Sequence, residues 1–236
     1  MARYETEEIN FHKFLNIARQ FHEVTLEQAC EGLCSVSMMK RIECGERLPE
    51  KQMRDRILSR IGVPLDGYED YLSTEEFEQW ELRQKILLSI ENKLVAEAED
   101  YLDAYRVYEK QNSVEVQYCD AMELMILQIK KAPMEKQQAV IEHAVELTMP
   151  KIENGLSKNL LLSAQELNLL TEHVWLREYS GNPKDEFGWR YKQYKEIMDY
   201  IKRSHLDNFC RAKVYPKVAY YLCELILHKV KTEENL

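Results

Sequence analysis

The chain of 236 residues is poor in helix-breaking residues, with seven glycines and six prolines. Leu, Glu, Lys, Gln, Met and Ala dominate instead, and these residues favour helix. No stretch alternates apolar and polar residues over a length useful for a strand. The composition therefore predicts an all-α protein, and the length allows one large or two modest domains.

Signatures of catalysis and of metal binding are also missing. The chain has no glycine-rich phosphate loop, no Gly-x-Ser-x-Gly elbow and no recurring pattern of His with carboxylates. Its six histidines are scattered, without a His-x-x-x-His pair. We therefore expect no enzyme activity, no cofactor and no metal site.

No apolar run is long enough to span a bilayer, and Met1–Asn10 does not read as a signal peptide. Cys30 and Cys34 lie one helical turn apart, with Cys44 nearby, but no fourth zinc ligand lies close in the sequence. Packing is the preferred interpretation for these residues, with thiol sensing as the alternative. We expect a cytoplasmic protein with reduced thiols and no membrane partner.

The most informative stretch is Thr25–Pro49, which reads as two short helices joined by a tight turn. A Thr-x-x-Gln capping box at Thr25 opens a helix over Leu26–Leu33. After a turn at Cys34–Ser35, a second helix is expected over Ser37–Glu43. Two such helices are too short to be stable alone, so they indicate a helix-turn-helix packed against its neighbours.

In the second of these helices, Met38 or Met39 and Ile42 are expected to face inward, while Lys40 and Arg41 face outward. Gly45 tolerates a positive φ just past the helix end, and Pro49 suits the first position of the next helix. The flanking helices are expected over Ile9–Phe21 and Pro49–Ile61. The buried residues expected on them are Phe11, Phe14, Leu15, Ala18, Met53, Ile57, Leu58 and Ile61.

The pattern Arg41-Ile-Glu43-x-Gly45-x-Arg47-x-Pro49, preceded by Gly32-Leu-Cys34-Ser35-x-Ser37, resembles the phage-repressor (XRE) type of helix-turn-helix. Its Gly-Leu-Cys-Ser form is similar to the Rgg and PlcR group of peptide-sensing regulators. The resemblance implies that the second helix enters the major groove of double-stranded DNA. The residues that it assigns to the DNA face are Ser35, Ser37, Met38, Lys40, Arg41 and Arg47.

Two positions depart from the family pattern. Leu26 stands where the family usually has a phosphate-binding Gln, and Glu46 stands where a basic residue commonly follows the glycine. Both changes weaken phosphate binding rather than the fold. They leave an alternative function open, in which the helix-turn-helix no longer binds DNA and the protein is a module for protein interaction.

The charge is unevenly distributed along the chain. Residues 1–62 hold ten Lys and Arg and ten Asp and Glu, so the formal net charge of −9 lies in the remainder, with 22 basic and 31 acidic residues. This division suits a DNA-reading head on an acidic body that does not contact phosphate. A neutral head predicts modest, salt-sensitive affinity and therefore two heads per site in a homodimer.

The cluster Gly62-Val-Pro64-Leu-Asp-Gly67 marks the expected domain boundary. We expect a DNA-binding domain at 1–63, a linker at 64–72 and a helical repeat domain at 73–236. Ser73 and Glu76 form a second expected capping box, and this junction also resembles that of the Rgg and PlcR group.

Beyond the boundary, amphipathic helix pairs are expected to begin near Ser73, Ser113 and Ser163, which is typical of lengthened tetratricopeptide-type repeats. The stripe at Tyr101, Tyr105 and Tyr108 is interpreted as packing rather than as a groove. The last expected helix, Val214–Lys231, has no partner after it. Either it packs on a second subunit or the family's C-terminal repeats are missing, and the sequence leaves this open.

The candidate ligand site lies on the helix that Ser163 and Glu166 open with a capping box. If Leu167, Leu170 and Val174 form its packed face, a neighbouring stripe is left for the concave groove. The residues of that stripe are Gln165, Asn168, Glu172 and Trp175. An Asn amide can hold an extended peptide through one backbone unit, so we expect a short signalling peptide as ligand. The alternative is that Asn168 and Glu172 are solvated and Trp175 is core.

Overall fold

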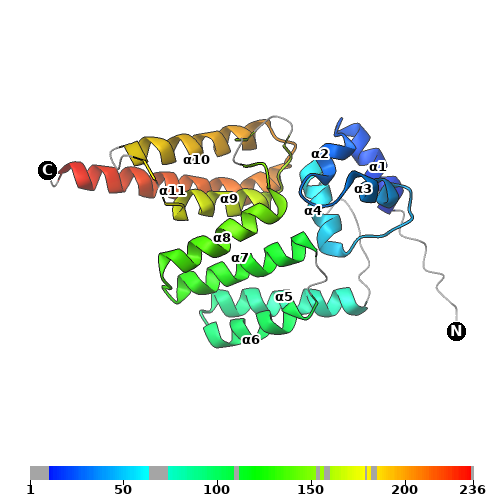
Figure 1. Cartoon of the computed structure of the whole chain (residues 1–236), viewed down its shortest axis with the longest axis horizontal. Coiled ribbons are helices and arrows are strands. Elements are labelled where there is room, and N and C mark those ends of the chain that lie inside the picture. Colours follow the sequence, from blue (N-terminus) through cyan, green and yellow to red (C-terminus); the bar gives the residue numbers. More distant parts are fainter. Residues whose placement is uncertain are drawn as a thin grey trace.

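The computed structural model describes residues 11–63, 74–108, 112–152, 155–156, 160–178, 180–181 and 185–234, and these residues contain helices and no strand. The expected all-α class is confirmed. The helices form an N-terminal head, α1–α4, and a body of stacked helices, α5–α11 (Figure 1). The C-terminal end of α11 lies at the opposite end of the molecule from the head.

The head has its own hydrophobic core, because each of its four helices turns an apolar face inward. Its helices are α1 (Phe11–Phe21), α2 (Leu26–Cys30), α3 (Val36–Glu43) and α4 (Lys51–Ile61). The largest buried apolar side chains of this core are Phe11, Leu15, Met39, Ile42, Ile57, Leu58 and Ile61. The expected inward faces of the first and last head helices are confirmed, with Phe14 and Ala18 partly buried against the core.

Two expected helix boundaries in the head are wrong. α2 ends at Cys30 rather than at Leu33, because Glu31 is non-helical (φ −55, ψ 123) and Gly32 has a φ of +71. α4 begins at Lys51 rather than at Pro49, with Glu50 in the cap position. Pro49 is instead buried, and its carbonyl accepts a hydrogen bond from Arg54 (2.6 Å).

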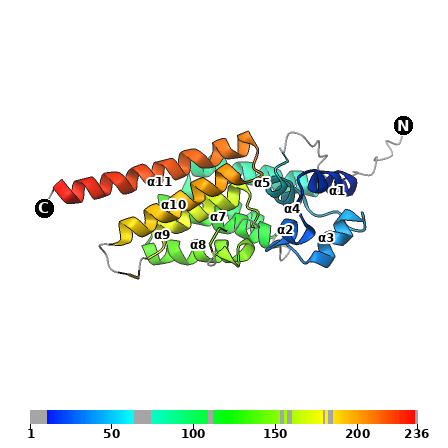
Figure 2. The same ribbon diagram turned by 90° about the horizontal axis from the view of Figure 1, so that it is seen from above.

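The body stacks its helices in antiparallel pairs, layer upon layer in chain order, as Figures 1 and 2 show. Its helices are α5 (Thr74–Glu91), α6 (Val95–Arg106), α7 (Ser113–Ile129), α8 (Met134–Thr148), α9 (Ala164–Leu176), α10 (Glu186–Arg203) and α11 (Asn208–Glu234). The arrangement is that of tetratricopeptide-type repeats, with one continuous core running from α5 to α11. Helix pairs begin at α5, α7 and α9, as the sequence predicts.

The last helix is longer than expected. α11 begins at Asn208 rather than at Val214, because Asp207 Oδ1 accepts the backbone N–H groups of Phe209 and Cys210 and so opens the helix early. It continues through Pro216 to Glu234. Tyr105 is fully buried and Tyr101 packs against the core, so packing is the right interpretation of these two residues. The expected capping box at Ser73 lies outside the described residues.

Candidate functional site

The expected recognition helix is present as α3, and its two faces are distinct. Ser35 caps it, with Oγ accepting the N–H of Met38 at 3.1 Å. Met39 and Ile42 are buried in the head, whereas Lys40 and Arg41 are exposed. Figure 1 shows α3 on the side of the head away from most of the body.

The C-terminal end of α3 is fixed to α1 by a partly buried ion pair. The guanidinium of Arg19 donates to both carboxylate oxygens of Glu43, at 2.5 and 3.0 Å, and also to the carbonyl of Val24 at 2.8 Å. Asn16 donates a further bond to Glu43 at 3.0 Å. The hydrogen bonds that Arg19 donates to Glu43 raise the pKa of Arg19 and outweigh the effect of burial. Glu43 therefore holds α3 in place and leaves its exposed face unobstructed.

Of the six residues assigned to the DNA face, Ser35 is the N-cap of α3, four lie within α3, and Arg47 lies in the loop that follows. Ser35, Ser37, Lys40, Arg41 and Arg47 are exposed, and Met38 is partly buried. Met38 and Arg47 also line a cavity of about 640 Å³ that reaches the start of α7.

Positive charge on this surface is limited. Arg41 forms an exposed ion pair with Glu46 at 3.2 Å, so Glu46 competes with phosphate for the guanidinium. Three further arginines of the head, Arg54, Arg56 and Arg60, are buried and out of reach of phosphate. This distribution leaves little positive charge on the surface of α3 for contact with phosphate.

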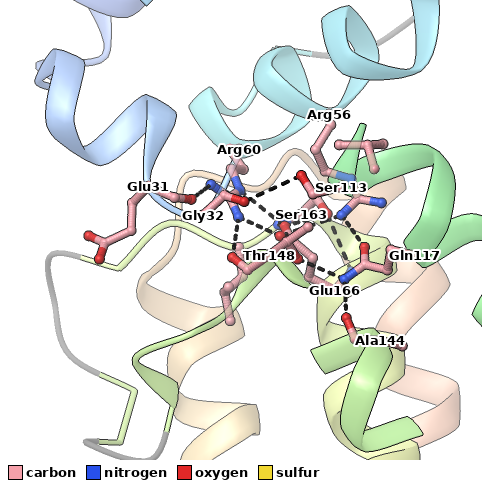
Figure 3. Close-up of polar contacts among 12 residues, drawn as sticks. Glu31, Gly32, Arg56, Arg60, Ser113, Gln117, Ala144, Thr148, Ser163 and Glu166 are labelled. Atoms are coloured by element: carbon pink, nitrogen blue, oxygen red, sulfur yellow. Dashed lines mark hydrogen bonds and ion pairs between the residues drawn. The ribbon is translucent and has the colours of Figure 1, made fainter. Parts of the chain in front are cut away.

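Two of those buried arginines join the head to the body through one carboxylate (Figure 3). Arg60 of α4 donates from two nitrogens to Glu166 at the start of α9, and Arg56 approaches the same carboxylate at 3.4 Å. Burial alone would raise the pKa of Glu166, but the charges of Arg60 and Arg56 and their hydrogen bonds lower it to about 2. Glu166 is therefore a carboxylate at every physiological pH.

The same junction brings two backbones unusually close. Gly32 and Gly62 both have a positive φ, and each lies against a carbonyl of the body. A Cβ at Gly32 would lie 2.0 Å from the carbonyl oxygen of Thr148, and one at Gly62 would lie 1.9 Å from that of His205. Only glycine fits at either position.

The expected packed face of α9 is confirmed, because Leu167, Leu170 and Val174 are buried in the core. On the neighbouring stripe, Gln165, Asn168 and Trp175 are partly buried and Glu172 is 8% exposed. Asn168 Oδ1 is buried and has no hydrogen-bond partner among the described residues.

The C-terminal part of this stripe contacts the helices on either side. Glu172 accepts from Tyr221 Oη at 2.6 Å and from Gln128 Nε2 at 3.2 Å, and it pairs with Lys217 at 2.8 Å. Trp175 packs on Tyr221 with ring centroids 5.1 Å apart. Burial raises the pKa of Tyr221, and the nearby carboxylate of Glu172 raises it further. The stripe therefore lies between α7 and α11.

The junction of head and body was not predicted from the sequence. Glu166 was expected only as a capping residue. The structure confirms that role, since Glu166 Oε2 accepts the N–H of Ser163 at 2.8 Å. The available signal was that α4 places three arginines among the apolar residues that face the core of the head. Within the described part of the chain, no group of three or more His, Cys, Asp or Glu side chains is placed to hold a metal. No described helix is long and apolar enough to cross a membrane.

No protein-family model and no curated protein matches the chain. Among solved structures, it is similar to the crystal structure of Bacillus thuringiensis PlcR in complex with the peptide PapR7 and DNA. The TM-score is 0.49 at 15% sequence identity, and the match covers 96% of this chain and 75% of that one. Similarity at this level says nothing about what this chain binds.

Proposed function

We propose that the protein is a DNA-binding transcriptional regulator that reads its operator with α3. The observation that supports this function is the geometry of α3, which is capped by Ser35, anchored by Glu43 and exposed at Lys40 and Arg41. A helix held from one side and open on the other suits insertion into a major groove. We keep residues 1–63 as the DNA-binding domain, 64–72 as the linker and 73–236 as the regulatory domain.

Removing the two basic side chains of α3 should weaken DNA binding without affecting the fold. We expect the double substitution Lys40→Ala/Arg41→Ala to weaken binding by about 30-fold or more, because a base or phosphate contact contributes about 1–3 kcal/mol. The measurement is a low-salt fluorescence-anisotropy titration with DNA from the gene's own upstream region. Since both residues are exposed, circular dichroism should show an unchanged helix content.

A matched control removes the same charge from the body. Lys192 and Lys195 are exposed on α10, far from α3, and Lys192→Ala/Lys195→Ala should bind the same DNA as the wild type does. If both double variants lost affinity equally, net charge rather than α3 would account for binding. If the wild type bound no upstream DNA at low salt, the regulator function would be wrong.

We further propose that the stripe on α9 holds a short peptide, with Asn168 as the residue that grips its backbone. The support is the buried Oδ1 of Asn168, which lacks a partner and is therefore able to accept a peptide N–H. The alternative, that Asn168 is solvated, fits less well because this oxygen is buried. Trp175 and the ion-paired Glu172 would bound the site on the side of α11.

Asn168→Ala should weaken peptide binding roughly tenfold, because it removes hydrogen bonds that together contribute about 1–2 kcal/mol. The measurement is isothermal titration calorimetry with short hydrophobic peptides encoded beside the gene. Gln193→Ala is the control, because Gln193 lines a cavity of about 560 Å³ on another face of α9. Loss of binding in Gln193→Ala alone would place the peptide in that cavity instead.

We also propose that the regulator acts as a homodimer, so that two heads meet a two-fold operator. The support is the exposed apolar surface of α11, whose residues are Phe209 (68%), Tyr220 (59%), Ile226 (46%), Leu227 (51%) and Val230 (45%). Apolar residues in one exposed row favour burial against a partner. The mass of the complex in the anisotropy samples, measured by light scattering, gives the number of chains per DNA.

A second candidate function is a protein-interaction module whose head no longer binds DNA. Two observations favour it, namely the pairing of Arg41 with Glu46 and the burial of Arg54, Arg56 and Arg60. Both reduce the positive charge available to phosphate. The low-salt titration separates the two functions, because the module would show no binding to DNA at all.

A further inference from the structure

Helix α9 contacts both the head and the helices on either side of its polar stripe. Its first turn reaches the head through Glu166, and its next turns carry Asn168 and Glu172 on the stripe facing α7 and α11. Glu166 and Asn168 are two residues apart on one rigid helix. A displacement of this stripe therefore moves the carboxylate that holds the head.

Arg60 moves with Glu166, because its buried side chain is hydrogen-bonded to partners from three segments of the chain. Besides Glu166, it donates to the carbonyl of Glu31 at 2.5 Å and to that of Thr148 at 3.2 Å (Figure 3). These partners belong to the end of α2, the end of α8 and the start of α9. A guanidinium offers its N–H groups in a fixed planar fork, so satisfying all three partners determines one orientation of α4.

Arg56 connects the same carboxylate to the centre of the body. It donates to Gln117 of α7 at 2.5 Å, and Gln117 in turn donates to Ala144 and Thr148 of α8, at 2.8 and 2.7 Å. Every side chain in this chain of contacts is buried. A buried polar group without its partner is energetically costly. Arrangements in which only part of the network is paired are therefore unfavourable, and the network changes between discrete, fully paired arrangements.

We propose that Arg60 is a positioning residue, which fixes the orientation of the head relative to α9 and so transmits displacement of the α9 stripe to α3. The inference rests on the proposed function, because it gives the α9 ligand a route to the DNA-reading helix. Arg60 contacts neither DNA nor ligand. It sets the angle at which the body presents the head.

The chain carries its own pair of labelling sites for the test. Cys44, at the end of α3, and Cys223, on α11, are exposed. Burial raises the pKa of Cys34 and of Cys210 to about 11, which leaves their thiols poorly reactive. Spin labels on Cys44 and Cys223, in chains diluted with unlabelled protein, therefore report the distance between head and body by pulsed electron paramagnetic resonance.

In the wild type we expect a single narrow peak in the distance distribution. In Arg60→Lys, which keeps the positive charge but lacks the planar guanidinium, we expect a broad distribution. Arg106→Lys is the control, because Arg106 pairs with Glu123 inside the body. It should leave the peak unchanged. If Arg60→Lys does not fold, the triple variant Arg56→Met/Arg60→Met/Glu166→Gln replaces it, since it removes all three buried charges together and keeps a capping side chain.

Transmission along α9 is tested by filling the stripe. Asn168→Trp places a bulky side chain among α7, α9 and α11, and we expect it to shift the peak in the wild-type background. In the Arg60→Lys background, where the distribution is broad, adding Asn168→Trp should leave the mean distance unchanged. A broad wild-type distribution, a narrow peak in a folded Arg60 variant, or a shift that persists without Arg60 would each overturn the proposal. None of these outcomes depends on DNA binding, so failure of the proposed function would be seen separately.

Discussion

Glu166→Ala should destabilise the folded chain by about 3–5 kcal/mol, because it leaves the guanidinium groups of Arg56 and Arg60 buried without their shared carboxylate. Arg56 is poorly placed to tolerate this loss. Its Nη2 already lacks a hydrogen-bond partner among the described residues, and desolvation lowers its pKa. Urea denaturation followed by circular dichroism measures the effect.

Part of this loss has another origin, because Glu166 also closes the capping box of α9. Gln28→Ala measures that part alone, since Gln28 closes the equivalent box of α2 without an arginine partner. We expect Gln28→Ala to cost about 1 kcal/mol. Equal losses in the two variants would mean that the ion pairs contribute nothing beyond the cap.

The Glu166 carboxylate also makes the free energy of unfolding depend on pH. Because the folded state lowers the pKa of Glu166 from 4.5 to about 2, its contribution is complete above pH 4.5 and is lost as the pH falls toward 2. The difference in stability between the wild type and Glu166→Ala should therefore shrink over this range. A difference that stayed constant from pH 6 to pH 3 would contradict the assignment.

Local features of the fold were predictable because their signals lie within a few residues. The capping boxes at Thr25 and Ser163 each join residues three apart, and both are present as expected. Gly45 takes the positive φ (+76) that follows α3. Helical periodicity predicted burial of Ile42 and of either Met38 or Met39, and the structure buries Ile42 and Met39.

Features that depend on distant partners were not predictable. Arg60 and Glu166 are 106 residues apart, and an arginine read without its partner is assigned to the surface. Gly32 shows the same limit, since α2 ends early where this glycine meets the carbonyl of Thr148. The DNA face and the peptide stripe remain predictions, because a recognition surface is defined by a partner that the sequence does not contain.

Gly62→Ala should destabilise the chain by about 2–5 kcal/mol, through two separable effects. The left-handed conformation (φ +91) disfavours any Cβ by about 1–2 kcal/mol. In addition, the Cβ would lie 1.9 Å from the carbonyl oxygen of His205, so that α4 and the body must separate, which costs about 1–3 kcal/mol more.

Gly155→Ala separates the two effects, because Gly155 has a similar φ (+84) but nothing within 4 Å of its Cβ position. We expect this control to lose only the conformational part, about 1–2 kcal/mol. The difference between the two variants in urea denaturation then measures the contact between head and body. Equal losses would show that Gly62 serves only to end α4. A larger loss in Gly62→Ala, with α4 amides that exchange hydrogen faster, would show that close backbone contact holds the head to the body.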